Sequence, residues 1–422
     1  MNKFFFLLYS IVIIVVFSFL LSGCVKDTCR GSHTYTYYMP LYKTWAEIRA
    51  NIKSNAPTEI KSPGKIVVLG NYIFLNEINK GIHVIDNTYP ISPKNISFID
   101  IPGNVDLAIK GNTLYADLYT ELVTLDISNP LNVIKTKITD GAFGNRFYGL
   151  GFTSDSTKII YDWIKHDTTI IEDCNTSPVN YNYPGGVFLA AAGTASNNNS
   201  ATPVGISGSM ARFALVNNYL YTVDDTYLNV FNVSNTNDPS FSSKVQIDWH
   251  VETIYPFKNN LFIGSNNGMY IYNIQSSPGN PVKAGQFIHA RACDPVIADD
   301  NFAYITLHSG TTCLGFNNQL DVVSLNNLTD ASLAKTYSFT SPHGLSKDGK
   351  LLFICDGTDG LKVYDASDVL NLKLIKHIAL TETYDVIAYN SRAIVVAKDG
   401  LYQFDYSNIN NIKLLSKINI TN

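Results

Sequence analysis

The stretch GLKVYDASDVLNLKLI (residues 360–375) reads as a β-strand, a short polar turn and the start of a second strand. Leu361 and Val363 have the period-two spacing of a half-buried strand. Asp365 and Asp368 are turn residues, because short polar side chains hydrogen-bond their own backbone. The stretch therefore predicts antiparallel β-structure.

The same pattern recurs along the chain. Six further copies begin at Gly81, Leu122, Tyr227, Gly268, Gln319 and Gly400. Most neighbouring copies lie 40 or 41 residues apart, and one interval, from Asn273 to Ser324, is 51 residues. A repeat of this length with several short strands predicts a β-propeller, in which each repeat forms one sheet, or blade, of a ring.

The second repeat shows the four strands of one predicted blade. They are VDLAIK (105–110), TLYAD (113–117), LVTLDI (122–127) and VIKTKI (133–138). Gly-Asn at 111–112 marks the first hairpin turn. No repeat holds a long stretch with helical periodicity, so the predicted fold class is all-β.

One interval is irregular. Asp126 and Asn232 are 106 residues apart, about 66 more than one period. We interpret the excess as an insertion at residues 142–207, made of a hairpin arm from Phe147 and a mobile loop that ends near Gly208. The chain is then a seven-bladed propeller. The alternative is that the arm forms a degenerate eighth blade.

The strand and turn LVTLDISNP (residues 122–130) and its copies resemble the LVIVD repeat. The resemblance covers about 350 residues, from Lys65 to the C-terminus, apart from the insertion. It implies a bacterial β-propeller that is secreted or lipid-anchored. The repeat family has no common activity, so the resemblance predicts a fold and leaves the function open.

The N-terminal segment is a targeting sequence. A basic residue and an almost wholly apolar run, residues 4–21, precede LSGC (21–24), which resembles the lipobox of bacterial lipoprotein signal peptides. This implies a signal peptide at residues 1–23 and a mature chain whose first residue, Cys24, is acylated and held on a membrane. The alternative is an uncleaved transmembrane anchor, since the apolar run is just long enough to span a bilayer.

The residue after Cys24 is not aspartate, which implies sorting to the outer membrane, on its periplasmic face or at the cell surface. Residues 24–62 form a lipid-anchored lead-in, and residues 63–422 form the propeller. Within the lead-in, Trp45 and Ile48 have helical spacing and predict a short helix. The net charge of −4 and the absence of a long basic run argue against nucleic acid as a partner.

Five cysteines remain besides Cys24, in an expected oxidising compartment. Cys293 and Cys313 lie 20 residues apart around the hairpin of one repeat and are the predicted disulfide. Cys355 lies in the apolar run LLFICDG and is predicted to be a buried small hydrophobic residue. No cysteine pair has the spacing of a zinc site, so no structural metal is expected.

Equivalent positions of the innermost strands should form a ring around the propeller channel. Counting back 20–22 residues from each turn, or 30 in the longest repeat, gives one polar residue per repeat: Lys65, Asp106, Arg212, Glu252, Asp294, His343 and Asp385. One interpretation is a set of charges that pair with one another and close the channel. The other is a ligand site at the channel mouth, where the excess of carboxylates favours a cation such as Ca²⁺.

The sequence predicts no catalytic residues, because no nucleophile motif accompanies the ring. His250 and His289 precede two ring positions and could extend the site, or serve as hydrogen-bonded loop residues. We therefore expect a non-catalytic binding or scaffolding module of the cell envelope. Its partners would be the membrane, through the lipid, and an envelope protein that contacts the insertion and the Cys293–Cys313 loop. The alternative is a small-ligand or cation receptor, or a hydrolase or lyase, that uses the ring.

Overall fold

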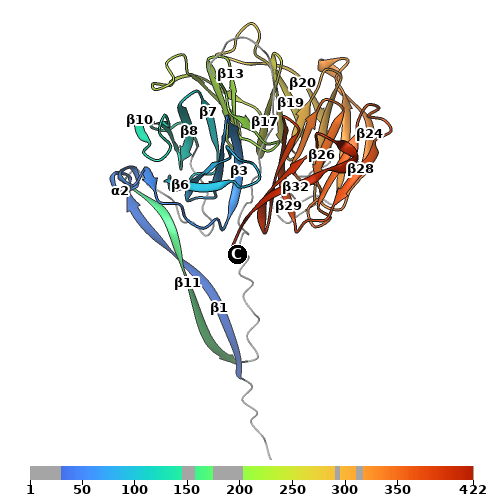
Figure 1. The fold of residues 1–422 in the computed structure, drawn as a ribbon. Helices are drawn as coiled ribbons and strands as arrows, with labels where there is room; N and C mark the ends of the chain where they lie inside the picture. The colour runs from blue at the N-terminus through green and yellow to red at the C-terminus, as the bar shows by residue number, and fades with distance from the viewer. Residues whose placement is uncertain (1–29, 145–156, 174–202, 290–294, 310–316, 422) are drawn as a thin grey trace, which may run out of the picture. The chain divides into compact units, whose positions relative to one another are not determined.

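The fold is that of a computed structural model (Figure 1), which describes residues 30–144, 157–173, 203–289, 295–309 and 317–421. The chain divides into two compact units. One comprises Met1–Leu41 and Asp162–Tyr183, and the other comprises Tyr42–Tyr161 and Pro184–Asn422. The second unit contains the propeller.

Within the described ranges, seven four-stranded antiparallel units form the blades of the propeller (Figure 1). Each blade takes its four strands in chain order, and inner strands of successive blades contact one another. The predicted all-β, seven-bladed fold is confirmed. The inserted strand β11 (Lys158–Asp173) pairs with a strand outside the blades, which excludes an eighth blade built from it.

The strands of the first two blades are β3 (Pro63–Leu69), β4 (Tyr72–Glu77), β5 (Gly81–Asp86), β6 (Lys94–Asp100), β7 (Leu107–Lys110), β8 (Thr113–Leu118), β9 (Glu121–Asp126) and β10 (Ile134–Thr139). Those of the third and fourth are β13 (Phe213–Val216), β14 (Tyr219–Val223), β15 (Tyr227–Asn232), β16 (Ser240–Gln246), β17 (Val251–Phe257), β18 (Asn260–Ser265), β19 (Gly268–Asn273) and β20 (Val282–Ile288). Those of the fifth and sixth are β21 (Val296–Ala298), β22 (Phe302–Leu307), β23 (Gln319–Ser324), β24 (Ser332–Ser338), β25 (Leu345–Asp348), β26 (Leu351–Cys355), β27 (Leu361–Asp365) and β28 (Lys373–Ile378). The seventh blade has β29 (Thr383–Tyr389), β30 (Arg392–Ala397), β31 (Gly400–Asp405) and β32 (Lys413–Asn419), and the 3₁₀ turns are η2 (Leu328–Asp330) and η3 (Ile409–Asn411).

The polar turn between the third and fourth strands has the predicted chemistry. Asp365 Oδ1 accepts hydrogen bonds from the backbone N–H and the hydroxyl of Ser367, at 2.9 and 2.6 Å. Asp126 accepts the same pair of bonds from Ser128, at 2.8 and 2.5 Å. The recurring sequence pattern is therefore a recurring turn stabilised by its own side chain.

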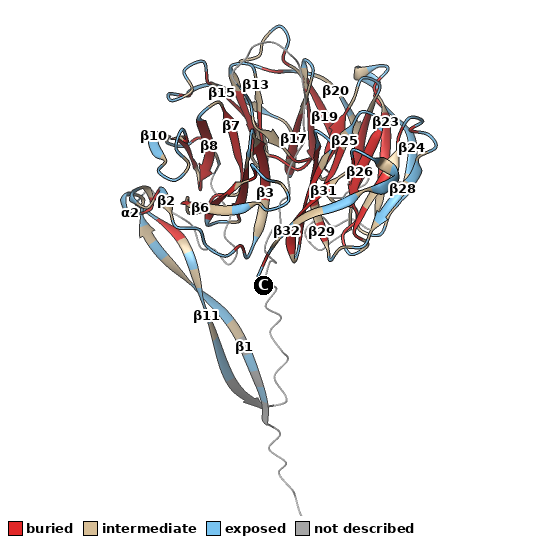
Figure 2. Cartoon of the chain, in the orientation of Figure 1, coloured by how far each residue is buried: buried red, intermediate tan, exposed pale blue. Residues whose placement is uncertain are grey.

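The hydrophobic cores lie between neighbouring blades, and Figure 2 shows buried residues concentrated in the inner strands and exposed residues in the outer ones. One core joins the first and seventh blades, with Ile66 packing in the same cluster as Ile387. The Thr421 N–H also donates to the Ile60 carbonyl at 2.9 Å. The ring closes as predicted. The four main strands of the first blade are consecutive in the chain, and so are the four strands of the last blade, so neither blade borrows a strand from the other end of the chain.

The first blade carries two additional strands. At its outer edge β2 (Lys53–Asn55) pairs with β6, and at its inner edge β12 (Ile206–Ser207) pairs with β3. Ile206 lies opposite Val68 in this ladder. The prediction of a mobile loop up to Gly208 is therefore wrong for residues 203–208, which return to the propeller and pair with it.

The arm consists of β1 (Arg30–Thr44) and β11. The structure thus pairs the inserted strand with the lead-in, and not with another strand of the insertion as predicted. Thr34 and Thr169 hydroxyls lie 3.0 Å apart across this ribbon, and the rings of Tyr37 and His166 stack at 5.3 Å. A pairing between strands more than 100 residues apart leaves no local pattern in the sequence.

The predicted short helix is α2 (Trp45–Ala50). Thr44 and Glu47 form a capping box: the Thr44 hydroxyl accepts from the Glu47 N–H at 3.3 Å, and the Glu47 carboxylate accepts from the Thr44 N–H at 2.7 Å. Ile48 is fully buried and anchors the helix. In the part of the chain that the structure describes, no helix has the length and hydropathy to cross a membrane.

Candidate functional site at the channel mouth

The predicted ring residues lie at or near the start of the inner strands. Lys65, Glu252 and Asp385 belong to β3, β17 and β29. Asp106 and Arg212 come directly before β7 and β13, and His343 comes two residues before β25. Asp294 lies outside the described residues.

The structure brings the charged members of this ring into one electrostatic neighbourhood. Lys65 is fully buried, with 1% of its surface exposed. Burial lowers the pKa of Lys65 from 10.5 to about 7, against the attraction of Asp106. The other charges that act on Lys65 are those of Arg212, Asp385 and Glu252.

Asp106 is held by backbone donors on both carboxylate oxygens. The Arg212 N–H donates to Oδ2, and the Leu107 N–H donates to Oδ1 at 2.7 Å. Burial raises the pKa of Asp106 from 3.8 to about 6, while Lys65 and these two donors oppose the rise. The carboxylate therefore ties the start of β13 to the start of β7.

Asp385 is confined between two glycines. Its Oδ1 accepts from the N–H groups of Val386 and Ser209, at 2.9 and 3.2 Å. A Cβ placed on Gly208 or Gly344 would lie only 2.0 or 2.2 Å from its carboxylate oxygens. Burial raises the pKa of Asp385 from 3.8 to about 8. Within the described ranges no donor reaches its buried Oδ2.

The channel is occupied by the chain itself. Residues 203–210, here called the channel segment, bond to the inner strands of four blades. The Gly205 N–H donates to Ile109 O at 2.8 Å, and the Gly208 N–H to Ile66 O at 3.4 Å. The Ser209 hydroxyl accepts from the Leu345 N–H at 2.5 Å. The Ser209 N–H also donates to Asp385. The segment therefore contacts blades one, two, six and seven.

The channel segment also satisfies the buried lysine. Lys65 Nζ donates to the Met210 carbonyl at 2.7 Å. The polar ring therefore surrounds and binds a stretch of backbone. This geometry favours the interpretation of the ring as a closed, internally bonded channel over that of an open ligand site.

Two histidines, one from the fifth blade and one from the sixth, lie next to each other. The rings of His308 and His343 lie 4.4 Å apart between centroids. Burial lowers the pKa of His343 to about 4 and that of His308 to about 3, the neighbouring His343 adding to the effect on His308. Both imidazoles are therefore neutral at physiological pH.

Sequence reasoning missed His308 and three supporting carboxylates. Glu77, Asp117 and Asp356 each lie nine residues before the turn residue of their repeat. Each accepts backbone N–H groups of the loop that enters its own blade, as Asp117 Oδ1 does from Val105 and Asp106, both at 2.9 Å. The same count from the turn, applied to second strands, would have found these three carboxylates.

The other predicted residues lie apart from this group or outside the described residues. His250 is exposed and contacts Asp225 at 3.1 Å, as a loop histidine would. His289 follows β20, with its ring 6.2 Å from that of Phe287. Cys355 is a buried free cysteine as predicted, and burial raises the pKa of its thiol. The remaining predicted cysteines, Cys24, Cys293 and Cys313, fall on residues that the structure does not describe, so their roles stay predictions.

The described residues do not contain a ligand set for the expected cation. Among them, no three His, Cys, Asp or Glu side chains are grouped so that they could hold a metal ion. Asp106 and Asp385 instead take their partners from backbone N–H groups.

Replacing Asp385 with asparagine should flatten the pH dependence of stability between pH 5 and 7. A carboxyl whose pKa rises from 3.8 to about 8 on folding stabilises the fold fully below 3.8 and loses that effect as the pH rises through 8. The free energy of unfolding should therefore fall with rising pH, by up to about 1.4 kcal/mol per pH unit for one proton. Asp106 adds to the slope up to about pH 6, and Lys65 opposes it only above about 7.

Urea denaturation of the wild type and Asp385→Asn at pH 5, 6 and 7 measures this slope. Asp365→Asn is the matched control, because Asp365 is an exposed turn residue whose pKa is lowered by Ser367. It should keep the wild-type slope. An unchanged slope in Asp385→Asn would contradict the assignment of a buried, protonated carboxyl.

The fold and the bonded channel define a closed β-propeller, and comparisons with known proteins identify its repeats. The sequence model of the LVIVD repeat matches residues 103–137 and 207–246, which cover the second blade up to the middle of β10 and all four strands of the third blade. The chain is therefore a seven-bladed β-propeller with LVIVD repeats. A search of curated proteins finds no match.

Several solved structures are similar to this chain, and those with a TM-score of 0.50 or more share its fold. A protein from Lactobacillus plantarum has a TM-score of 0.51 at 12% identity, with 85% of this chain and 97% of that chain covered. The periplasmic gluconolactonase PpgL of Pseudomonas aeruginosa has a TM-score of 0.50 at 12% identity, with 85% and 96% covered. A functionally unknown protein from Desulfotomaculum acetoxidans has a TM-score of 0.47 at 13% identity, with 85% and 95% covered. Identities this low show similarity of fold alone.

Proposed function

We propose that this chain is a lipid-anchored, non-catalytic binding module of the cell envelope, and that its protein partner binds the two-stranded arm. The observation that carries the proposal is the filled channel. A propeller with an open channel offers a ligand site there, whereas here Lys65, Asp106 and Asp385 bind the chain's own backbone. Binding is therefore assigned to the outer surface.

The arm has the side chains of a protein interface. On β1, Tyr37, Tyr38 and Met39 are 41%, 44% and 49% exposed, and on β11 Ile164 is 42% exposed. Tyrosine and methionine are enriched in protein interfaces. A two-stranded ribbon has little core of its own, so apolar side chains on it gain stability when a partner covers them.

The N-terminal sequence supports the envelope location. The LSGC motif at residues 21–24 is similar to the lipobox of bacterial lipoprotein signal peptides. Arg30 is the sixth residue after Cys24, which puts it at most about 21 Å away in an extended chain. An acylated Cys24 would thus keep the first residue of β1 close to the outer membrane, on its periplasmic face or at the cell surface.

A second candidate is an enzyme or small-ligand receptor at the channel mouth. Asp106 and Asp385 favour it, because raised pKa values of about 6 and 8 suit acid–base chemistry near neutral pH. One fold neighbour is a periplasmic gluconolactonase. The accessibility of the two carboxylates weighs against it, since they are only 1% and 3% exposed and bond to backbone N–H groups.

Changing the apolar side chains of the arm should abolish partner binding and leave the propeller stable. In the triple variant Tyr37→Ser, Tyr38→Ser, Met39→Ser, the lost side chains are exposed, so the free energy of unfolding should change by less than about 0.5 kcal/mol. Crosslinking in intact cells, followed by purification of the lipid-anchored chain, measures the binding. The wild type should yield one defined crosslinked envelope protein, and the variant should yield none.

The matched control removes apolar side chains of the propeller surface. Tyr89, Ile91 and Leu131 are 72%, 71% and 58% exposed, and their triple serine variant should crosslink as the wild type does. Cys24→Ser should release the chain from the membrane fraction. Equal crosslinking by the arm variant and the wild type would refute the assignment of the partner to the arm.

A further inference from the structure

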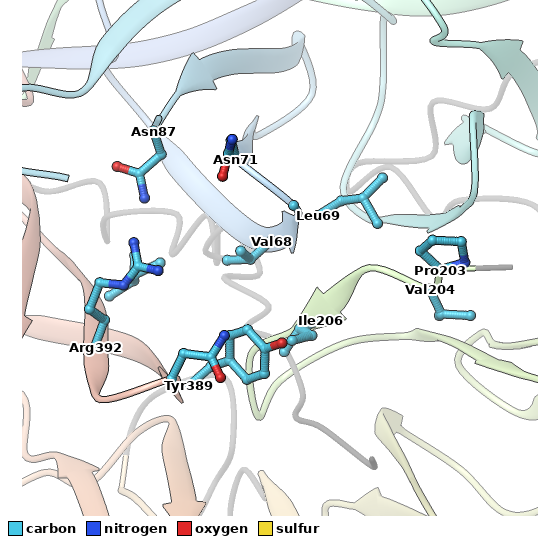
Figure 3. A pocket seen from close by; sticks show the side chains of 12 residues that line it. Val68, Leu69, Asn71, Asn87, Pro203, Val204, Ile206, Tyr389 and Arg392 are labelled. Atoms are coloured by element: carbon cyan, nitrogen blue, oxygen red, sulfur yellow. The ribbon is translucent and has the colours of Figure 1, made fainter. Parts of the chain in front are cut away.

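A cavity of about 370 Å³ lies at the opposite end of the inner strands from the polar ring. Its walls come from the turn that follows β3, from the turn that follows β29, and from Pro203, Val204 and Ile206 of the channel segment. Figure 3 shows these three walls around one space. The cavity therefore exists because the insertion returns to the first blade. Its volume is in the range of small-molecule sites.

One wall carries an unpaired cation. Of the described residues that line the cavity, Arg392 alone is charged. The ion pairs formed within the described ranges leave Arg392 without a carboxylate partner. An arginine guanidinium offers a planar fork of N–H donors that matches a carboxylate. The cavity is thus set up for a ligand with one negative charge.

The hairpin turn before Arg392 fixes the backbone position of this residue. Asn390 and Ser391 both have positive φ angles, 49° and 59°, which is the geometry of a tight two-residue hairpin turn. This pairs Tyr389 with Arg392 across the turn. Neither turn residue is glycine, so the backbone accepts some strain to present these two side chains.

The remaining walls combine amides with an apolar floor. The side chain of Asn87 is oriented by a reciprocal amide pair with Gln403, at 3.0 and 2.7 Å. Asn71 is exposed at the rim, and Val68 and Ile206 form apolar surface. Figure 3 shows Arg392, Asn87 and Asn71 along one side of the space, with Tyr389 beside Ile206. Such a set of groups suits a molecule with hydroxyls on a compact carbon frame.

We propose that this cavity binds a small hydroxylated carboxylate of about the size of a sugar acid. Arg392 binds the carboxylate, Asn71 bonds to hydroxyl groups, and the Tyr389 ring packs on the carbon frame with Val68 and Ile206. This site is independent of the partner surface on the arm, because it rests on residues of the propeller alone.

Isothermal titration calorimetry with the mature chain tests the site, with D-glucuronate as the probe. The wild type should bind D-glucuronate, and Arg392→Met should lose at least about tenfold in affinity. Lys350→Met is the matched control, since Lys350 is an exposed cation on the corresponding turn of the sixth blade. It should bind as the wild type does.

Two further measurements separate the alternatives. Val204→Trp, at a position 38% exposed, should fill the cavity and abolish binding with Arg392 still present. D-glucose should bind more weakly than D-glucuronate, because it lacks the carboxylate. The proposal is overturned by wild-type affinity in Arg392→Met, by no binding of D-glucuronate to the wild type, or by tighter binding of inorganic phosphate, which would make the cavity a phosphate site.

Discussion

Lys65→Met should lower the free energy of unfolding by about 3 kcal/mol or more. Lys65 is fully buried, donates to the Met210 carbonyl and lies beside Asp106 in the channel. Removing one member of a buried charge pair leaves the other without compensation, which typically costs 3–5 kcal/mol. The Met210 carbonyl also loses its buried donor. Urea denaturation at about pH 6.5, between the pKa values of Asp106 (about 6) and Lys65 (about 7), measures the loss.

The double variant Lys65→Met, Asp106→Asn should recover part of this loss, because a neutral amide replaces the carboxylate that has lost its cationic partner. Lys94→Met provides the surface comparison, since Lys94 is exposed at the start of β6, the fourth strand of the same blade. It should change stability by less than about 0.5 kcal/mol. If Lys65→Met were as mild as Lys94→Met, the ring would not be a structural element of the channel.

Gly208→Ala should cost about 3 kcal/mol through overpacking alone. Its new Cβ would lie 2.0 Å from Asp385 Oδ2. The Asp385 carboxylate cannot move away from this Cβ, because Gly344 packs against its other side and two backbone N–H groups donate to Oδ1. The channel segment would have to move away from Asp385, and Ser209 would lose its bonds. Thermal or urea unfolding of the purified chain detects the change.

Gly144→Ala is the matched control for this variant. A Cβ on Gly144 meets only Asp224 Oδ2, at an ordinary 3.8 Å. Asp385→Ala removes the group that blocks Gly208, so Gly208→Ala should cost much less in that background than in the wild type. Equal costs in the two backgrounds would mean that the contact with Asp385 is not what excludes a side chain at residue 208.

The strand order and the blade number could be predicted because each repeat carries its own local signal. Alternating apolar residues and a self-bonded aspartate turn, as at Asp365, specify two strands and their connection without reference to the rest of the chain. Equivalent positions also lie at a nearly constant distance from the turn in each repeat. A residue count from the turn therefore placed Lys65, Asp106 and Asp385 at the start of inner strands. These inferences need only neighbours in sequence.

The contents of the channel could not be predicted in this way. Residues 203–210, PVGISGSM, alternate glycine and serine with single apolar residues and come before the first strand of the third blade, so they looked like a loop. Their partners, Ile66, Ile109, Leu345 and Asp385, are spread over most of the chain. The pairing of β1 with β11 and the cavity at Arg392 are likewise products of contacts between distant segments. Local periodicity carries no information about such contacts.

The position of the channel segment in the chain has a consequence for how the molecule assembles. Residues 203–210 lie after the second blade and before the first strand of the third, which begins at Phe213. The segment can dock on β3 and β7 while the channel is still an open groove between two blades. The later blades then close around it, so no free end has to thread a finished ring, a step that proteins almost never take. The order of the chain thus makes the first two blades and this segment a natural starting unit for folding during synthesis, which proceeds from the N-terminus.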